Sequence, residues 1–135
     1  MGITKDGIEG EQMLFKWIRE RGYEFFQPDA ISLQEGEYVI YEAKHQERYK
    51  PPPFEGHGLP KWQVMARLFF EIKTGIKTIL IVFDKETNEI FYNYLSELEK
   101  REHIDTHGTK PRRIYKLSSF NTSVLENNLV AGGQR

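Results

Sequence analysis

A run of six strand-forming residues, Thr78–Phe83, limits the fold of this chain more than any other feature. A short continuous run of this kind is typical of a β-strand that is covered on both faces. The run follows a helical pattern that begins near Pro60, a residue suited to the first helical position, and ends at Gly75. A helix that leads into a buried strand predicts an α/β domain with a mixed sheet. The helix is expected to turn one side toward the core: Trp62, Met65, Ala66, Phe69 and Ile72.

A β-hairpin is predicted upstream, where residues 30–33 and 38–41 flank the segment Gln34-Glu35-Gly36-Glu37. A two-residue Glu35-Gly36 loop pairs Gln34 with Glu37. Each further step from the loop pairs the next two residues, so Asp29 lies opposite Glu42.

Side-chain alternation in this hairpin gathers charge at one end of a single face. Ile31 and Leu33 share the face of Asp29, and Tyr38, Ile40 and Lys44 share that of Glu42. Opposed carboxylates destabilise a sheet unless something compensates for them, and a hard divalent cation such as Mg²⁺ does so. The alternative is structural: Asp29 opens a strand after Pro28, and the segment from Glu42 to Lys44 is a solvated edge.

The helix predicted for residues 7–21 supplies a third carboxylate. Leu14, Phe15 and Ile18 recur at helical spacing, and Glu11 lies on the same face at its N-terminal end. This stripe is expected to pack on the sheet, so that three acids and one lysine converge.

Two segments resemble known nucleases. Pro28-Asp29, twelve intervening residues and Glu42-Ala43-Lys44 resemble the PD-(D/E)XK signature, and the segment from Lys5 to Tyr23 resembles the opening helix of archaeal-type Holliday junction resolvases, in which a catalytic Glu matches Glu11. The resemblance covers about residues 5–84. The chain departs from the resolvases in one respect, because only residues 24–28 separate Tyr23 from Asp29, where those proteins carry a Ser/Gly-rich segment.

The resemblance implies a restriction-endonuclease-like core, with a mixed central β-sheet flanked by helices, and a Mg²⁺-dependent DNA endonuclease in which Mn²⁺ substitutes for Mg²⁺. Asp29, Glu42, the Ala43 carbonyl and Glu11 would hold the ion, and Lys44 would orient the attacking water or stabilise the developing charge. Gln63 resembles a Gln of virus-type replication–repair nucleases that would touch DNA or this water, although a helix-surface amide is the simpler interpretation. The resolvases are homodimers that act on branched DNA, so both properties are expected here.

DNA affinity must come from local clusters, because 19 Lys and Arg residues are balanced by 20 Asp and Glu residues. One cluster beside the proposed site contains His45, Arg48, Tyr49 and Lys50, and a basic loop contains Lys110, Arg112 and Arg113. Lys5 is a further candidate. The alternative for each cluster is an ordinary solvated surface.

The length of 135 residues fits one nuclease domain, with a core of about residues 5–120 and a frayed tail at about 129–135. The absence of an apolar run long enough to span a membrane, of a signal-peptide pattern and of cysteine favours a cytoplasmic location. The four histidines lack zinc-site spacing, and His57, between two glycines, is expected in a mobile loop. The competing functions are a restriction-, homing- or repair-type endonuclease on duplex or flap DNA and an inactive nucleic-acid-binding module.

Overall fold

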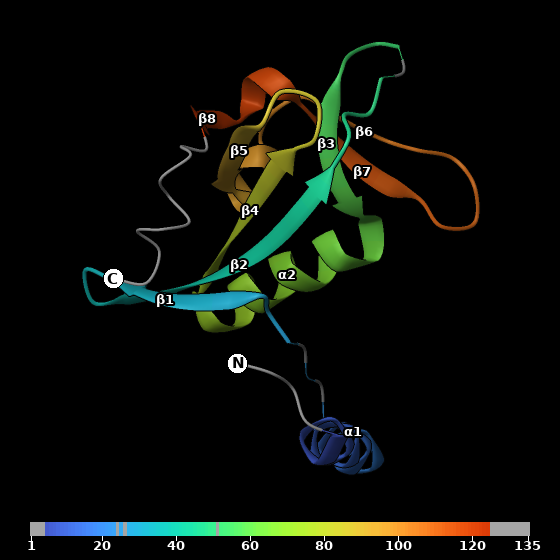
Figure 1. The fold of residues 1–135 in the computed structure, drawn as a ribbon, viewed down its shortest axis with the longest axis vertical. Coiled ribbons are helices and arrows are strands. Elements are labelled where there is room, and N and C mark those ends of the chain that lie inside the picture. Colours follow the sequence, from blue (N-terminus) through green and yellow to red (C-terminus); the bar gives the residue numbers. More distant parts are fainter. Residues whose placement is uncertain (1–4, 24, 26, 51, 125–135) are drawn as a thin grey trace.

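Two β-sheets and the helices around them form the structure, a computed structural model that describes residues 5–23, 25, 27–50 and 52–124 (Figure 1). The predicted tail at 129–135 lies outside the described residues. In chain order the elements are α1 (Lys5–Glu20), β1 (Ala30–Gln34), β2 (Glu37–Gln46), β3 (Gly56–Pro60), α2 (Lys61–Thr74), β4 (Lys77–Asp84), β5 (Glu89–Tyr94), α3 (Leu95–Glu99), β6 (His103–Asp105), β7 (Arg112–Lys116), a 3₁₀ turn (Leu117–Ser119) and β8 (Asn121–Val124).

The central sheet has the strand order β1-β2-β4-β5-β8. β2 and β4 are parallel and are joined through β3 and α2, while the other neighbouring pairs are antiparallel. The main core lies against this sheet, where Leu80 and Val82 of β4 pack with Val64 of α2 and with Leu95 and Leu98 of α3. The mixed α/β fold with a central sheet flanked by helices is therefore confirmed.

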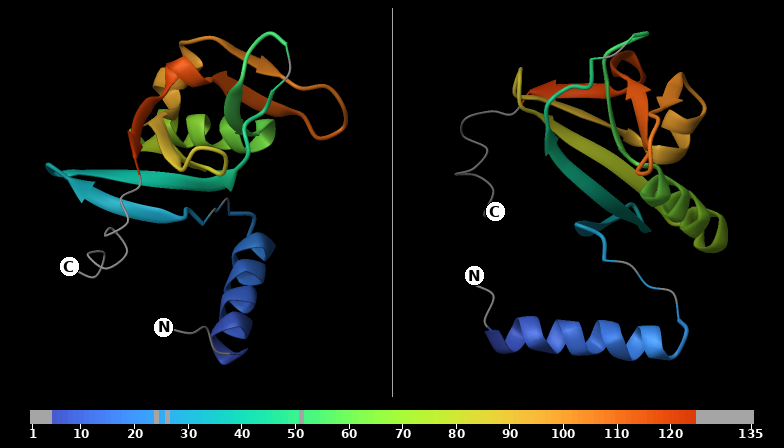
Figure 2. Two further views of the ribbon diagram at one scale, coloured as in Figure 1. Left: turned by 45° about the horizontal axis from the view of Figure 1, so that its top comes forward. Right: turned by 90° about the vertical axis from the view of Figure 1, so that its right-hand side faces the viewer.

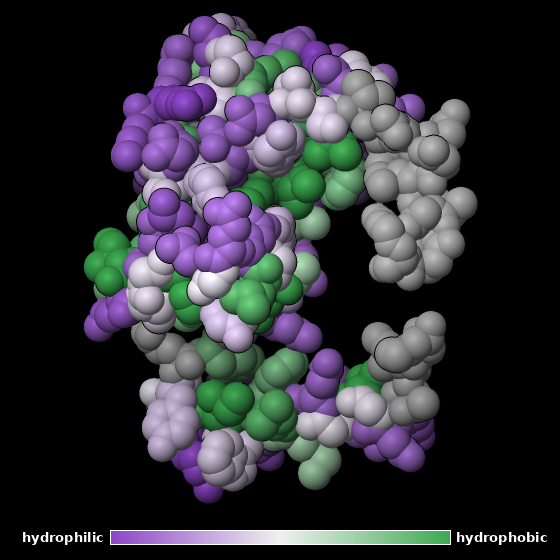
Figure 3. Space-filling model, turned by 90° about the vertical axis from the view of Figure 1, so that its left-hand side faces the viewer, coloured by the Kyte–Doolittle hydropathy of each residue, from purple (hydrophilic) through white to green (hydrophobic). Residues whose placement is uncertain are grey.

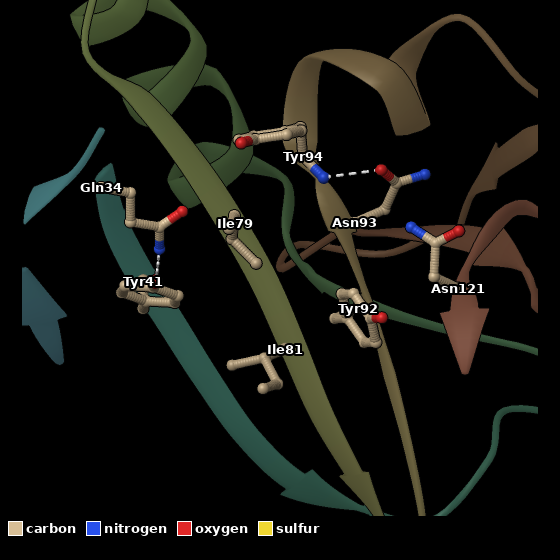
Figure 4. Close-up of a pocket in the computed structure, with 8 residues that line it drawn as sticks. All are labelled: Gln34, Tyr41, Ile79, Ile81, Tyr92, Asn93, Tyr94 and Asn121. Atoms are coloured by element: carbon tan, nitrogen blue, oxygen red, sulfur yellow. Dashed lines mark hydrogen bonds between the residues drawn. The ribbon is translucent and has the colours of Figure 1, made fainter. Parts of the chain in front are cut away.

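The two faces of β4 are covered unequally. Leu80 and Val82 are buried, whereas Ile79 and Ile81 on the other face are only half-buried, so the expectation of cover on both faces holds for one face among the described residues. The open face contains a hollow of about 370 Å³, lined by side chains from all five strands of the sheet (Figure 4): Gln34, Tyr41, Ile79, Ile81, Tyr92, Asn93, Tyr94 and Asn121.

A second sheet, with the order β3-β7-β6, was not predicted. Its strand β3 falls in the segment 45–59 whose sequence reads as irregular, because Gly56 and Gly58 are poor strand formers. The strand needs these glycines, since a Cβ at Gly58 would collide with the backbone carbonyl of Arg113 on β7. His57 between them is fully buried, so its expected place in a mobile loop is wrong.

The orientation predicted for α2 is also wrong. The buried residues of the helix are Gln63, Val64 and Arg67, whereas Trp62 and Ile72, expected to face the core, are 70% and 80% exposed. The apolar stripe fails as a guide because the two long polar side chains find a buried acceptor on the sheet.

The first helix stands apart from the sheets. α1 has no buried residue and lies beyond the β1 edge of the central sheet (Figure 2), so the predicted packing of its apolar stripe on the sheet of the same chain is wrong. Its stacking contact is local, since the Phe15 ring stacks on Phe25 with 5.0 Å between ring centroids. Within the described part of the chain, α1 and the other helices fall short of the length and apolar character that a membrane-spanning helix requires.

Candidate active site

The hairpin has the predicted register. Gln34 pairs with Glu37 and Ala30 with Tyr41, and both loop residues have positive φ, 50° at Glu35 and 83° at Gly36, as a type I′ turn requires. Directly before β1, the Asp29 amide donates at 3.1 Å to the carbonyl of Tyr41, the residue that pairs with Ala30. Asp29 therefore lies directly before β1, next to Tyr41 and Ala43 of β2, and its pairing with Glu42 stays a prediction.

The Asp29 carboxylate is tied to the neighbouring strand. Its Oδ2 accepts the backbone N–H of Ala43 at 2.7 Å, although the side chain is otherwise exposed. This bond fixes one oxygen of Asp29 next to the backbone between Glu42 and Lys44. The other oxygen is left open toward solvent.

Glu42 is buried, with 3% of its surface exposed, and α2 supplies a donor to each of its oxygens. Gln63 Nε2 donates to Oε1 at 2.9 Å, and Arg67 Nε donates to Oε2 at 2.6 Å. Gln63 is buried and bound to Glu42, so the interpretation of Gln63 as a helix-surface amide is wrong, and its contact with DNA or water stays a prediction. A buried carboxylate needs a partner of this kind, because removing an unpaired charge from water costs several kcal/mol.

Arg67 is the residue that sequence reasoning missed. It is 5% exposed and lies one helical turn after Gln63, so the spacing of four residues between two polar side chains was the available signal. The sequence suggested a bound metal ion as the only compensation for the negative charge of Glu42. The guanidinium of Arg67 also compensates for this charge.

Lys44 lies two residues after Glu42 on the same strand and therefore on the same face of the sheet. It is half-buried, and its ammonium group has no ion-pair partner within the ranges that the structure describes. A cation held at the strand end without a carboxylate partner is available for an anionic ligand.

Glu11 is not brought to this site, because α1 stands off and Glu11 is exposed on it. Among the described residues, no three His, Asp or Glu side chains gather closely enough to hold a metal ion. The oxygen donors of Asp29, Glu42 and the Ala43 backbone suit Mg²⁺ in chemical type. The set within one chain is therefore one carboxylate short of the predicted three.

Much of the charge in the first basic cluster is committed within the chain. Arg48 forms ion pairs with Asp84 at 2.8 Å and with Glu55 and Glu89 at 3.3 Å each, and Lys50 pairs with Glu86 at 2.8 Å.

The two other candidates of this segment, Tyr49 and His45, differ in their surroundings. Tyr49 is held by a β-bridge to Gly56, whereas His45 is exposed. These partners explain why the segment folds as it does, and they leave His45 as its accessible candidate for DNA.

The arginines of the second cluster are likewise paired. Arg113 binds Asp105 at 2.8 Å and Glu99 at 2.8 Å, and Arg112 donates to the Gly58 carbonyl at 3.0 Å. Lys110 is exposed in the loop that precedes them, and Lys5 is exposed at the start of α1. The two lysines remain the accessible cations of these predicted DNA contacts.

A pH effect follows from Asp105. The hydrogen bonds from Arg113, against the opposing effect of burial and with help from Lys61, hold the pKa of Asp105 well below its usual value of 3.8. An acid with a lowered folded-state pKa stabilises the fold above its unfolded pKa, and this contribution is lost as the pH falls below it. The free energy of unfolding is expected to decrease below about pH 4, and less steeply in Asp105→Asn. Urea denaturation between about pH 2 and pH 6 measures this; equal slopes in both proteins would contradict it.

Another acid and the buried histidine form a separate polar cluster. Burial lowers the pKa of the His57 ring, whose nitrogens lie 2.8 Å from Asp84 Oδ2 and 3.1 Å from Gln46 Oε1. Arg48 Nε donates to the same Asp84 oxygen at 2.8 Å. This cluster joins the ends of β2 and β4 to β3, and its burial makes it a structural feature.

Comparison with known proteins found a structural resemblance that extends over nearly the whole chain. No protein-family model and no curated protein sequence matches the chain. Among solved structures, it is similar to Hjc of Archaeoglobus fulgidus, a Holliday junction resolvase from an archaeal hyperthermophile. The identity is 15% and the TM-score 0.47, over 95% of this chain and 97% of that one. A similarity at this level does not support a functional assignment, which rests on the residues of the site.

Proposed function

We propose that the chain is a metal-dependent DNA endonuclease of the PD-(D/E)XK type that acts on branched DNA. The observation that supports the proposal is the hydrogen bond that holds the Asp29 carboxylate beside Ala43, the residue between Glu42 and Lys44 on β2. Both acids have partners within the chain, whereas Lys44 on the same strand has no ion-pair partner among the described residues and is available for an anionic ligand.

Each residue of the site has its own role in the proposed reaction. Asp29, Glu42 and the Ala43 carbonyl would hold Mg²⁺, or Mn²⁺ in its place, and Glu11, which lies apart from them within one chain, would be the further ligand. The bound ion polarises the scissile phosphate and lowers the pKa of a water molecule. Lys44 presents its ammonium group to the phosphate and stabilises the charge that grows on it. Gln63 and Arg67 fix the position of the Glu42 carboxylate, and through it the geometry of the site.

The branched substrate rests on the resemblance of the signature and opening helix to the junction resolvases. A junction is resolved by paired cuts in two strands, and a chain with one site supplies one of them. A homodimer with two-fold symmetry provides both, so we propose a homodimer as the active form.

A panel of DNA substrates tests this function. Wild-type protein is incubated with a four-way junction whose core cannot migrate, with a flap and with a linear duplex, each with Mg²⁺ or with EDTA. We expect cleavage of the junction but not of the flap or the duplex, and only when Mg²⁺ is present. Cleavage of duplex or flap instead would select the restriction- or repair-type alternative, and binding without any cleavage would select the inactive module.

Lys110 provides a prediction for DNA binding. Its charge is exposed and unpaired among the described residues, so it is expected to contact a phosphate and release a counterion. Lys110→Gln should weaken binding and reduce the salt slope of the binding constant by about one. Lys100→Gln, which removes an exposed lysine elsewhere, is the matched control. An unchanged slope in Lys110→Gln would remove this loop from the DNA contact surface.

A further inference from the structure

The α1 helix exposes several large apolar side chains. Ile8, Leu14 and Trp17 are 44%, 52% and 49% exposed, and Figure 3 shows hydrophobic residues at the surface of this helix at the bottom of the view. Isolated helices of about 15 residues are marginal in water, and most of their stability in proteins comes from packing an apolar face. The 16 residues of α1 therefore need a surface to pack against.

A second exposed apolar surface lies on the side of the central sheet where α2 packs. Ile31, Leu33 and Tyr38 of the hairpin share the face of Glu42, whose carboxylate contacts α2. A monomeric protein rarely exposes so much apolar area without a partner. We call this the hairpin–α2 surface and define it by six side chains that are 49–80% exposed: Ile31, Leu33, Tyr38, Trp62, Phe69 and Ile72.

The connection between α1 and the hairpin is short. The Phe25 ring stacks on Phe15, Arg19 lies over it at 5.8 Å, and the Tyr23 amide donates to the Ile18 carbonyl, so Tyr23 and Phe25 are held against α1. Four residue steps remain between Phe25 and Asp29, which span at most about 14 Å. A short hinge of this kind favours exchange of the helix between two copies over its return to the sheet of the same chain.

The carboxylate that the site lacks is carried by the same helix. Glu11 lies on the face of Leu14 and Ile18, so a partner surface that covers this face also receives Glu11. The hairpin–α2 surface lies on the same side of the sheet as Glu42.

We propose that two copies of the chain exchange α1, so that the helix of each packs on the hairpin–α2 surface of the other and its Glu11 completes the Asp29–Glu42 site there. In a dimer with two-fold symmetry this contact forms twice, so that α1 and the hairpin–α2 surface are covered in both copies. The exchange itself is independent of the activity, whereas the role of Glu11 rests on the proposed nuclease function.

Disulfide crosslinking tests the exchange without any assay of activity. The chain has no cysteine, so each introduced thiol is unique. Leu14→Cys and Phe69→Cys proteins are refolded together and oxidised, and we expect a disulfide-linked heterodimer. Lys16→Cys, on the opposite side of α1, is the matched control and should crosslink to Phe69→Cys far less. A doubly substituted chain that forms the 14–69 disulfide only within itself, or the failure of any 14–69 crosslink, would overturn the exchange.

Complementation tests the role of Glu11. Glu11→Gln and Asp29→Asn are each expected to be inactive, but a heterodimer of the two contains one complete site if Glu11 acts on the other copy. A co-refolded equimolar mixture should then nick the junction at about a quarter of the wild-type rate, because half the dimers are mixed and half their sites are complete. A mixture as inactive as its components would place Glu11 in its own chain and overturn the proposal. An inactive wild type would refute the proposed function, and the crosslink would then decide the exchange alone.

Discussion

Lys44→Ala is expected to abolish DNA cleavage while most of the DNA affinity remains. Lys44 is half-buried beside Glu42 and has no ion-pair partner among the described residues, so its ammonium group is free to meet the scissile phosphate. Removal of a donor that stabilises charge in the transition state lowers the rate by a factor of about 10²–10³. We therefore expect a loss of at least about 100-fold in the single-turnover cleavage rate, with a change of only a few fold in the dissociation constant.

Lys100→Ala is the control for this experiment, because it removes an exposed lysine at the end of α3, whose side-chain contact is with Glu97. It should cleave at the wild-type rate. Lys44→Ala protein that also cleaves at that rate would show that the role assigned to Lys44 is wrong.

Arg67→Met is expected to cause the largest loss of stability. The guanidinium donates to Glu42 Oε2 at 2.6 Å, and both side chains are more than nine-tenths buried. Removal of one partner leaves the other charge buried and uncompensated, which costs about 3–5 kcal/mol. Urea denaturation measures the loss as a shift of the unfolding midpoint.

The double variant Glu42→Gln/Arg67→Met separates the buried charge from the lost packing. It removes both charges and keeps the shape of the acid, so most of the lost free energy should return. Lys73→Met, on the exposed side of the same helix, should leave the midpoint nearly unchanged. A double variant no more stable than Arg67→Met would contradict the assignment of the loss to a buried charge.

The part of the site formed by the hairpin was predictable because its geometry is local. A Gly in a two-residue loop sets the register, and the pairing from Gln34–Glu37 to Ala30–Tyr41 follows from it, whereas the placement of Asp29 opposite Glu42 stays a prediction. The six-residue run likewise predicted β4 and the mixed sheet, since a continuous apolar run has few other uses in a chain of this composition.

The errors arose where tertiary contacts decide the outcome. The apolar stripe of α2 faces outward because the buried Glu42 binds Gln63 and Arg67, an interaction between residues 21 and 25 positions apart that no helical pattern reveals. The basic clusters carry fewer free charges than their sequences suggest, because Arg48 and Arg113 are paired with acids remote in the sequence. In the same way, the amphipathic pattern of α1 indicates that the helix needs a partner, but the choice of partner is a tertiary matter.

The central claim is that Asp29 and Glu42 form the metal-dependent centre of a DNA nuclease. Its most direct test is the rate of Mg²⁺-dependent cleavage of a four-way junction by wild-type protein, Asp29→Asn and Glu37→Gln, the last of which removes an exposed acid of the same hairpin. We predict cleavage by wild type and Glu37→Gln only when Mg²⁺ is present, and none by Asp29→Asn. Cleavage by Asp29→Asn at the wild-type rate would contradict the account.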